Sequence, residues 1–526
     1  MKNFPGAERK GAGAMCSLPN PPARRSSALL LKVAAALSLA ALGGLSMFGC
    51  ASPVRRHMPV AQHAEGDRKV LAFDMQRAGR PDYWEYLEGD GRVHAIAFAE
   101  ASGQPGSPLV LDEMDQSSIP HFVILLDGVP FHMVEEARRD GLFRLFYAPS
   151  KVICCYPSMT DLALSDVMHA GACYSLQALG FDRARNCKCG GNSAYLSSDN
   201  APWVAKVNYR ASPWWDGLMY LDPQKVFNHE LQGLKKTFAK FQEGEAYGYA
   251  VGTAGLGTRY GREGMSKYLC DIDAFCRQLV YERCGRVRIT LAADHGHDLT
   301  HAQLVSFRDV LDAGGYRETE SLREPRDVVV IAFGLVTYAE FYTQDAAGVA
   351  ECLLNHEGVE FTCYAAGDKV VIRDCEGFAC ISQGPGGELR YDSSQGDPLK
   401  LNPILERLTH AGKIAPNGEI DAEAMFYATV EHEYPDPLAR VWRAFHGLVQ
   451  SPPDVIAGLR SGYCHGSRFF YEAIGKGVAS THGGLRRDTS TTFVMSMLGD
   501  LPPALRSQDI LPALARLREV RQRSAE

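Results

Sequence analysis

The chain has 526 residues, of which 46% are hydrophobic and 22% charged, and its formal net charge is −7. This composition excludes a disordered chain, and the length is sufficient to bury a large core without help from metals or disulfides. The acidic balance argues against a nucleic-acid-binding module, which needs a basic surface. A phosphate-containing small molecule remains compatible with it, because a bound metal can reverse the local field of an acidic protein.

The first 49 residues have the pattern of an export signal. A pair of arginines precedes an apolar stretch at 28–48, and Gly49-Cys50 follows it. A basic flank, an apolar core and a small residue before the cut are typical of such signals. Cys50 resembles the lipidated first residue of a bacterial lipoprotein, while simple cleavage and a retained membrane anchor are the alternatives. We therefore expect an exported protein of the periplasm or cell envelope, with membrane attachment through a lipid on Cys50 or an N-terminal anchor.

Fifteen cysteines are present, and none form CxxC pairs at zinc-ribbon spacing. Cys154-Cys155 and the pair at 187 and 189 are too close together for a structural zinc site. Disulfides are possible in an oxidising compartment, and buried thiols are the alternative.

The segment before the main domain divides into a tether and a small β appendage. Residues 50–67 are polar and contain prolines, which predicts a tether. Residues 68–118 hold strand-like runs at 69–73 and 93–98 between turn-forming glycines, which predicts the appendage.

Two strands of the main domain, which we place at 119–500, each end in a carboxylate. The apolar run 121–126 is followed by Asp127-Gly128, and the run 286–293 is followed by Asp294. Continuous apolar runs are typical of strands buried on both faces of a parallel sheet, so both acids are expected at the sheet's carboxyl edge. Helical patterns at 226–241 and 264–281 lie between these two strands.

The second half of the chain is predicted to be mixed. An α+β portion at about 327–450 is expected to continue the central sheet, and residues 501–526 are expected to form a basic helical tail. The other expected elements are strands at 328–333, 359–364, 369–373, 378–381 and 492–497, and helices at 346–354, 401–408 and 421–429.

Four segments carry side chains suited to metal or phosphate chemistry. Each places an oxygen or imidazole ligand beside a glycine or at the end of an element, where backbone can approach a ligand closely. Two carboxylates, a histidine and a hydroxyl suit Zn²⁺, with Mn²⁺ and Ca²⁺ as alternatives. The segments are Leu126-Asp127-Gly128, Tyr156-Pro157-Ser158-Met159-Thr160, Asp294-His295-Gly296-His297 and Thr481-His482-Gly483.

These four motifs, in this order, resemble the type I phosphodiesterases and nucleotide pyrophosphatases of the alkaline phosphatase superfamily. The resemblance covers about 119–498 and includes Tyr434-Pro435-Asp436-Pro437. It implies an α/β fold: a three-layer αβα sandwich with a largely parallel central sheet and a site at the carboxyl ends of its strands. The small β appendage would precede this domain.

The resemblance also implies roles for single residues. Thr160 matches the family's nucleophile, and Asp127, Thr160, Asp294 and His295 match the ligands of the metal that activates it. His482 matches one ligand of the second metal. The implied activity is metal-dependent hydrolysis of a small-molecule phosphate ester, a diester or pyrophosphate rather than a monoester, with zinc as the expected cation.

The chain departs from the family pattern at the second metal. The family's segment Asp-x-x-Gly-His-x-Tyr-Gly corresponds to 254–261, where Ala254 replaces the acid and Thr258 the imidazole. Many relatives have an asparagine that helps to hold phosphate, and the residue at the corresponding position in this chain is Ala163. One metal site is therefore expected and the second is in question. The alternative function is a catalytically reduced relative that binds an anionic or phosphorylated ligand without turnover.

The same residues also fit other interpretations. Cys155 with Pro157 and Ser158 approaches the sulfatase signature, although Met159 stands where that signature needs arginine. Thr160 could be an ordinary helix N-cap, and His295 an ordinary core histidine. His297 and His301 could join a metal if they were helical, but solvent-facing or outer-shell positions are the expectation.

Overall fold

The structure is a computed structural model that describes residues 56–114, 119–219, 222–474 and 478–525. The chain divides into a unit that ends at Ser52 and a second unit that runs from Pro53 to the C-terminus. The expected export signal and Cys50 lie outside the described residues. Among the helices that are described, none combines the length and the apolar character needed to cross a membrane.

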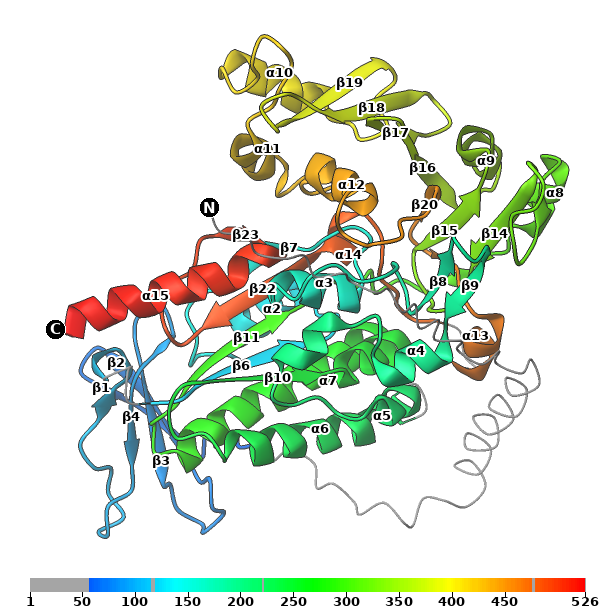
Figure 1. Ribbon diagram of the computed structural model, residues 1–526. Helices are drawn as coiled ribbons and strands as arrows, with labels where there is room; N and C mark the ends of the chain where they lie inside the picture. The colour runs from blue at the N-terminus through cyan, green and yellow to red at the C-terminus, as the bar shows by residue number, and fades with distance from the viewer. Residues whose placement is uncertain (1–55, 115–118, 220–221, 475–477, 526) are drawn as a thin grey trace, which may run out of the picture. The chain divides into compact units, whose positions relative to one another are not determined.

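An antiparallel five-stranded sheet begins the described chain (Figure 1). Its strands are β1 (Ala61–Glu65), β2 (Arg68–Phe73), β3 (Tyr83–Leu87), β4 (Val93–Phe98) and β5 (Leu109–Val110). The sequence predicts a tether where β1 lies, and this part of the prediction is wrong. All five β1 residues are exposed, so the strand has no apolar alternation and is defined by its pairing with β2.

A buried ion pair joins this N-terminal sheet to the long helix α7 (Gly252–Glu282). Arg277 Nε donates to Glu85 Oε1 at 2.9 Å, and its Nη1 lies 3.1 Å from Asp273 Oδ2.

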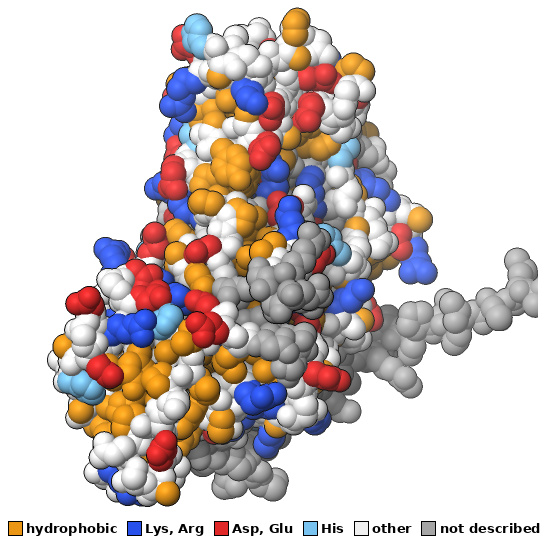
Figure 2. Space-filling view, turned by 90° about the vertical axis from the view of Figure 1, so that its left-hand side faces the viewer, with side chains coloured by type: hydrophobic (Ala, Val, Ile, Leu, Met, Phe, Trp, Pro, Cys, Tyr) orange, Lys and Arg blue, Asp and Glu red, His pale blue; other side chains and the backbone are white. Residues whose placement is uncertain are grey.

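On the face shown in Figure 2, hydrophobic side chains gather over the N-terminal sheet, and acidic and basic side chains are interspersed elsewhere. Exposed hydrophobic residues of the N-terminal region are Met58, Val60 and Leu109.

The central sheet has six strands and is largely parallel, as predicted. Their order is β10 (Glu245–Ala250), β6 (His121–Leu126), β11 (Arg288–Ala293), β22 (Thr491–Ser496), β7 (Ser150–Ile153) and β23 (Ala504–Arg506). Only β22 runs against the others. In the register of β6 and β11, Leu126 is opposite Ala293, so the residues that follow both strands emerge side by side at the carboxyl edge.

Helices cover both faces of this sheet, which makes the predicted three-layer αβα sandwich (Figure 1). Alternate residues of β6 divide between two apolar clusters: Phe122, Ile124 and Leu126 in one, Val123 and Leu125 in the other. The first cluster includes α2 (Phe131–Arg139), α6 (Pro223–Phe238) and α7. The second includes α3 (Thr160–Val167), the 3-10 helix η4 (Pro202–Lys206) and α15 (Ile510–Ala525).

Helix α7 is broken at Gly261, whose φ of 57° and ψ of −138° are not helical, and the predicted helix at 264–281 corresponds to the segment after this break. The sequence does not predict the segment before the break, which begins at Gly252. Its first turns are rich in glycine, because a Cβ at Gly255 would lie only 2.7 Å from the carbonyl oxygen of Met219. Small residues that allow this close approach also remove the apolar periodicity of a helix. The backbone N–H groups of Val251 and Gly252 each donate to a carboxylate oxygen of buried Glu230 at 2.8 Å, which caps the helix.

The portion predicted to continue the central sheet instead forms a sheet of its own. Its strand order is β13 (Arg317–Glu318), β14 (Asp327–Ile331), β15 (Tyr338–Thr343), β20 (Val455–Leu459), β16 (Val359–Ala366), β17 (Lys369–Arg373), β18 (Phe378–Gln383) and β19 (Leu389–Gln395). All pairs except β13–β14 are antiparallel. Strand patterns predict strands but not their partners, which explains the error.

The remaining elements connect or cover these sheets. The C-terminal tail is helical only from Ile510, after β23 and the 3-10 helix η5 (Ser507–Asp509). All cysteines of the described chain are free thiols. The other elements are η2 (Leu111–Glu113), β8 (Leu179–Asp182), β9 (Cys187–Gly190), α4 (Asn192–Ser197), α5 (Pro213–Leu218), β12 (Gln303–Leu304), α8 (Arg308–Ala313), α9 (Ala346–Leu353), α10 (Asn402–His410), α11 (Ala422–Thr429), α12 (Pro437–Phe445), β21 (Tyr463–Cys464), α13 (Arg468–Ile474) and α14 (Arg487–Ser490).

Candidate metal and nucleophile site

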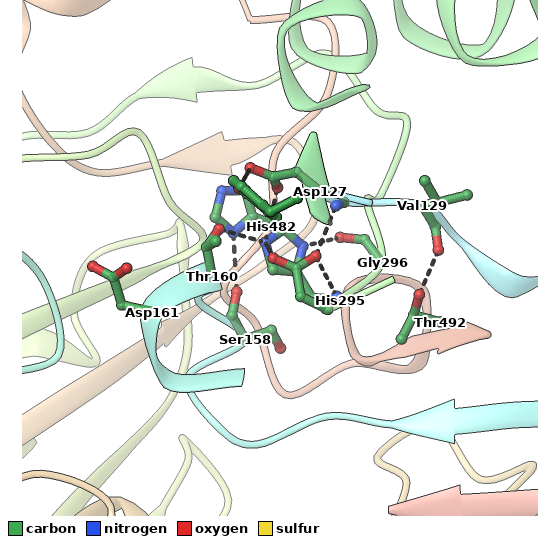
Figure 3. Close-up of polar contacts among 12 residues, drawn as sticks. Asp127, Val129, Ser158, Thr160, Asp161, His295, Gly296, His482 and Thr492 are labelled. Carbon is green, nitrogen blue, oxygen red and sulfur yellow. Dashed lines mark hydrogen bonds and ion pairs between the residues drawn. The ribbon is translucent and has the colours of Figure 1, made fainter. Parts of the chain in front are cut away.

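The two acid-bearing strands deliver their carboxylates to one place. Asp294 Oδ1 accepts hydrogen bonds from the backbone N–H groups of Gly128 and His295, each at 2.8 Å. Asp127 Oδ2 accepts one from the hydroxyl of Tyr249 in β10, at 2.6 Å. The other oxygens, Asp127 Oδ1 and Asp294 Oδ2, lie 3.5 and 3.6 Å from the same atom, His295 Nε2 (Figure 3).

His295 presents a lone pair to these carboxylates. Its Nδ1 lies 2.9 Å from the carbonyl oxygen of Gly296, which can only accept, so Nδ1 carries the proton. The side chain is fully buried, and burial lowers its pKa to about 4, which keeps the ring neutral near pH 7. A neutral imidazole whose second nitrogen is fixed by a backbone carbonyl is the usual form of a metal-binding histidine.

Thr160 brings a hydroxyl to the same nitrogen. It is the first residue of α3, after the N-cap Met159, and its Oγ1 lies 3.3 Å from His295 Nε2 (Figure 3). The N-cap interpretation of Thr160 is therefore wrong, because the cap position belongs to Met159. Asp161 points elsewhere and accepts a hydrogen bond from Trp203 Nε1 at 2.9 Å.

His482 packs against this group from the opposite loop. Its ring stacks on that of His295, with centroids 4.1 Å apart and planes at 13°. Its Nδ1 donates to the carbonyl oxygen of Ser158 at 2.9 Å, and Ser158 Oγ donates to the carbonyl oxygen of Gly484 at 2.8 Å. These bonds tie the segment that precedes Thr160 to the loop of His482, so the second and fourth motifs meet in space.

The residues that surround His295 Nε2 could hold a divalent cation. Within the described ranges, one group of three or more His, Cys, Asp or Glu residues has ligand atoms within 4.8 Å of one another, and it is Asp127, Asp294 and His295. Asp294 Oδ2 is buried and accepts no hydrogen bond from any described residue, and burial raises the pKa of Asp294 to about 6. A cation would compensate both buried carboxylates, and an O, O, N donor set with a hydroxyl suits zinc.

The turn that corresponds to the family's second-metal segment is present without its ligands. Ala254 and Thr258 lie in the first turns of α7, and Ala254 packs into an apolar cluster. The Thr258 carbonyl oxygen accepts a hydrogen bond from Ala479 N at 2.8 Å, three residues before His482. This turn therefore lies against the His482 loop but offers no carboxylate or imidazole to it.

One neighbour of the site is missed by sequence reasoning: Tyr249 carries no motif, and only the register of β10 beside β6 brings it to Asp127. Of the two positions expected for His297 and His301, solvent-facing or outer-shell, His297 is fully buried beside His295 and His482, whereas His301 is exposed. The segment between them is not helical. The sequence signal for placing His297 near the site is its spacing from His295, because residues two apart in an extended segment point to the same side.

The sulfatase interpretation does not fit the structure. The side chain of Cys155 is 2% exposed and packs in an apolar cluster with Tyr156 and Leu162. Its thiol donates to the carbonyl oxygen of Pro157 at 3.5 Å. Burial raises the pKa of Cys155 well above its ordinary value, so it presents no reactive thiolate.

No family model matches the sequence, and no curated protein matches it. Among solved structures, phosphonoacetate hydrolase from Sinorhizobium meliloti 1021 with phosphonoformate has a TM-score of 0.42 and 14% identity, over 80% of this chain and 98% of that chain. Human ectonucleotide pyrophosphatase/phosphodiesterase 5 has a TM-score of 0.43 and 12% identity, over 76% and 94%. Both TM-scores are below 0.5, so the activities of these two proteins say nothing about the activity of this chain.

Proposed function

We propose that this protein is a metal-dependent hydrolase of phosphate esters, of the type I phosphodiesterase kind, with Thr160 as its nucleophile. One observation carries the proposal. The Thr160 hydroxyl lies 3.3 Å from His295 Nε2, and that nitrogen is also the point on which Asp127 and Asp294 converge. A nucleophilic hydroxyl at the centre of a hard-ligand group is what metal-assisted phosphoryl transfer requires.

The four residues around that point would hold the cation, and their donor set favours zinc. A cation bound there would act as a Lewis acid and would lower the pKa of the Thr160 hydroxyl. Tyr249 and the N–H group of Gly128 hold the two carboxylates in place, so the ligands need little rearrangement to bind.

Thr160 then acts in two steps. Its oxygen attacks phosphorus and its hydroxyl proton passes to solvent, while the ester oxygen departs with the bonding electron pair and takes a proton from solvent, so that Thr160 becomes esterified. Water next attacks the same phosphorus and gives up a proton, the bond between phosphorus and Thr160 Oγ1 breaks, and that oxygen takes up a proton to restore the hydroxyl. A diester substrate is thereby released as an alcohol and a phosphate monoester. The first turn of α3 presents backbone N–H groups near Thr160, where they would stabilise the phosphoryl oxygens.

The proposal also includes a substrate class and a cellular location. The sequence resemblance supports a small-molecule diester or pyrophosphate rather than a monoester. The basic flank, the apolar stretch 28–48 and Cys50 support export to the periplasm or cell envelope, with lipid attachment at Cys50.

A second candidate function is ligand binding without turnover. It is favoured by Ala254 and Thr258, which leave α7 without the two ligands that the family's second metal needs. Such a protein would bind a phosphorylated or anionic ligand at the Asp127 group and release it unchanged.

Turnover of a chromogenic phosphodiester separates these two functions. The full-length protein, stripped with a chelator and reloaded with Zn²⁺, Mn²⁺ or Ca²⁺, should hydrolyse bis(4-nitrophenyl) phosphate faster than 4-nitrophenyl phosphate. Thr160→Ala should abolish turnover with the fold retained, and Thr160→Ser should keep appreciable activity, because it preserves the oxygen. Metal binding without hydrolysis under all three loadings supports the binding protein. Full activity in Thr160→Ala removes Thr160 as the nucleophile.

A further inference from the structure

His297 is a fully buried histidine whose ring faces the candidate site. It follows His295 by two positions, and its ring centroid lies 5.2 Å from that of His482. A Cβ at Gly128, the residue after Asp127, would lie 2.6 Å from His297 Nε2. This ring nitrogen therefore sits directly over the turn that carries the first carboxylate.

The surrounding hydrogen bonds fix which nitrogen of His297 carries the proton. Ser480 Oγ accepts a hydrogen bond from Leu299 N at 2.9 Å and donates to Asp298 Oδ1 at 3.4 Å. Since its proton goes to Asp298, Ser480 Oγ accepts the proton of His297 Nδ1 at 2.8 Å. Nε2 keeps its lone pair, and no described residue donates a hydrogen bond to it. The hydrogen bonds from His297 to Ser480 and from Ser480 to Asp298 fix the orientation of the imidazole, as such outer-shell bonds do for histidines that bind a metal.

We propose that His297 and His482 together form a second transition-metal site beside the Asp127 group; the proposal rests on the function proposed above. His482 Nδ1 donates to Ser158, so its Nε2 also carries a lone pair. Two imidazoles that bind one ion at about 2.1 Å with a tetrahedral angle have ring centres roughly 5 Å apart. The 5.2 Å separation of His297 and His482 meets this condition, whereas the stacked rings of His295 and His482 do not face a common point.

His297 also lies beside the turn from which the family's ligands have been lost. A Cβ at Gly257, between Ala254 and Thr258 in sequence, would lie 3.9 Å from His297 Nδ1. The imidazole absent from α7 is thus supplied from the loop after β11. Two protein ligands fill half of a tetrahedral shell, and water or phosphate oxygens take the rest. Phosphate should therefore strengthen binding of the second ion.

Metal content of the full-length protein tests the inference. Chelator-treated protein is dialysed against Zn²⁺ with and without inorganic phosphate, and zinc per chain is measured by plasma mass spectrometry. With phosphate, wild type should hold two ions, and His297→Ala, His297→Gln and His482→Ala should each hold one. The exposed histidine variant His301→Ala is the matched control and should hold two. Circular dichroism confirms that each variant is folded.

The outcomes separate this inference from the proposed function. One ion in wild type, with phosphodiester turnover intact, overturns the two-histidine site and leaves the function standing. A second ion that persists in both His297 variants also overturns it, because another residue must then supply the ligand. If wild type binds no zinc with or without phosphate, both the inference and the proposed metal-dependent function fail.

Discussion

The candidate site has two halves that differ in how the fold supports them. The proposed nucleophile half comprises Asp127, Thr160, Asp294 and His295, and the proposed second-metal half comprises His297, His482 and the α7 turn with Ala254 and Thr258. In the first half, both carboxylates directly follow paired strands of the central sheet. In the second half, the side chains come from two loops and a glycine-rich helix start.

This difference shows where substitution is tolerated. The register of β6 and β11 fixes Asp127 and Asp294 through backbone hydrogen bonds, and each carboxylate is anchored by a further donor. Neither can be replaced from elsewhere without moving a strand of the core. A ligand of the α7 turn can be replaced by a loop residue that reaches the same point, which is the role proposed for His297.

The largest effect is expected from breaking the nucleophile half. Asp294→Asn should reduce kcat by roughly three orders of magnitude or more, because it removes the negative charge that holds the cation beside Thr160. His482→Asn, the matched change in the other half, should reduce kcat by roughly 10–100-fold. Steady-state kinetics with bis(4-nitrophenyl) phosphate measures both. Equal losses in the two variants would contradict the division into unequal halves.

A restored α7 turn should compensate for the loss of His297. Ala254→Asp with Thr258→His, built into His297→Ala, should regain the second zinc ion and roughly tenfold in kcat, since it returns a carboxylate and an imidazole to the turn beside the His482 loop. Zinc content and kcat are measured together. If neither recovers in a folded variant, the turn does not face the second ion.

Gly128 links the halves, and its substitution should affect both stability and metal content. Gly128→Ala places a Cβ at φ +64° and 2.5 Å from His297 Cδ2. The backbone strain should cost about 1–2 kcal/mol, and displacement of His297 should remove the second ion. Gly367→Ala is the control, because Gly367 has the same φ of +64° and no atom within 4 Å of its Cβ. Thermal unfolding and zinc content distinguish strain from displacement; identical results for the two variants would exclude the displacement.

The smallest effect on the site is expected from substitution of Glu340, a buried residue outside both halves. Glu340 in β15 is fully buried, and burial raises its pKa to about 8, against the hydrogen bond from Gln177. The folded state holds this proton more tightly than the unfolded state, so stability falls as pH rises from about 4.5 towards about 8. Glu340→Gln should remove that part of the slope, worth on the order of a few kcal/mol, with zinc content unchanged.

The prediction for Glu340 is checked by denaturant unfolding in chelator near pH 5 and near pH 9. Wild type should lose more stability over this interval than Glu340→Gln. An equal loss in the two proteins would show that Glu340 does not hold its proton in the folded state.

The neighbouring positions of Asp127 and Asp294 could be predicted from the sequence better than the rest of the molecule. Continuous apolar runs predict β6 and β11, and strand direction places Asp127 and Asp294 at one edge. The separate second sheet was not predicted, because strand patterns do not specify pairing partners. β1 was missed since all of its residues are exposed, and the helical segment of α7 before Gly261 was missed because glycines replace its apolar stripe. The burial of His297 depends on contacts with Ser480 and Gly128, which only tertiary structure provides.

Asp127, Asp294 and His295 are proposed to bind a cation beside Thr160. This cation can be located in an anomalous difference map, measured just above the zinc edge from crystals of the full-length protein grown with Zn²⁺. A peak is expected within about 2.0–2.2 Å of a carboxylate oxygen of each aspartate and of His295 Nε2. Ordered side chains of all three residues with no peak between them, under conditions where the protein is active, would contradict this proposal.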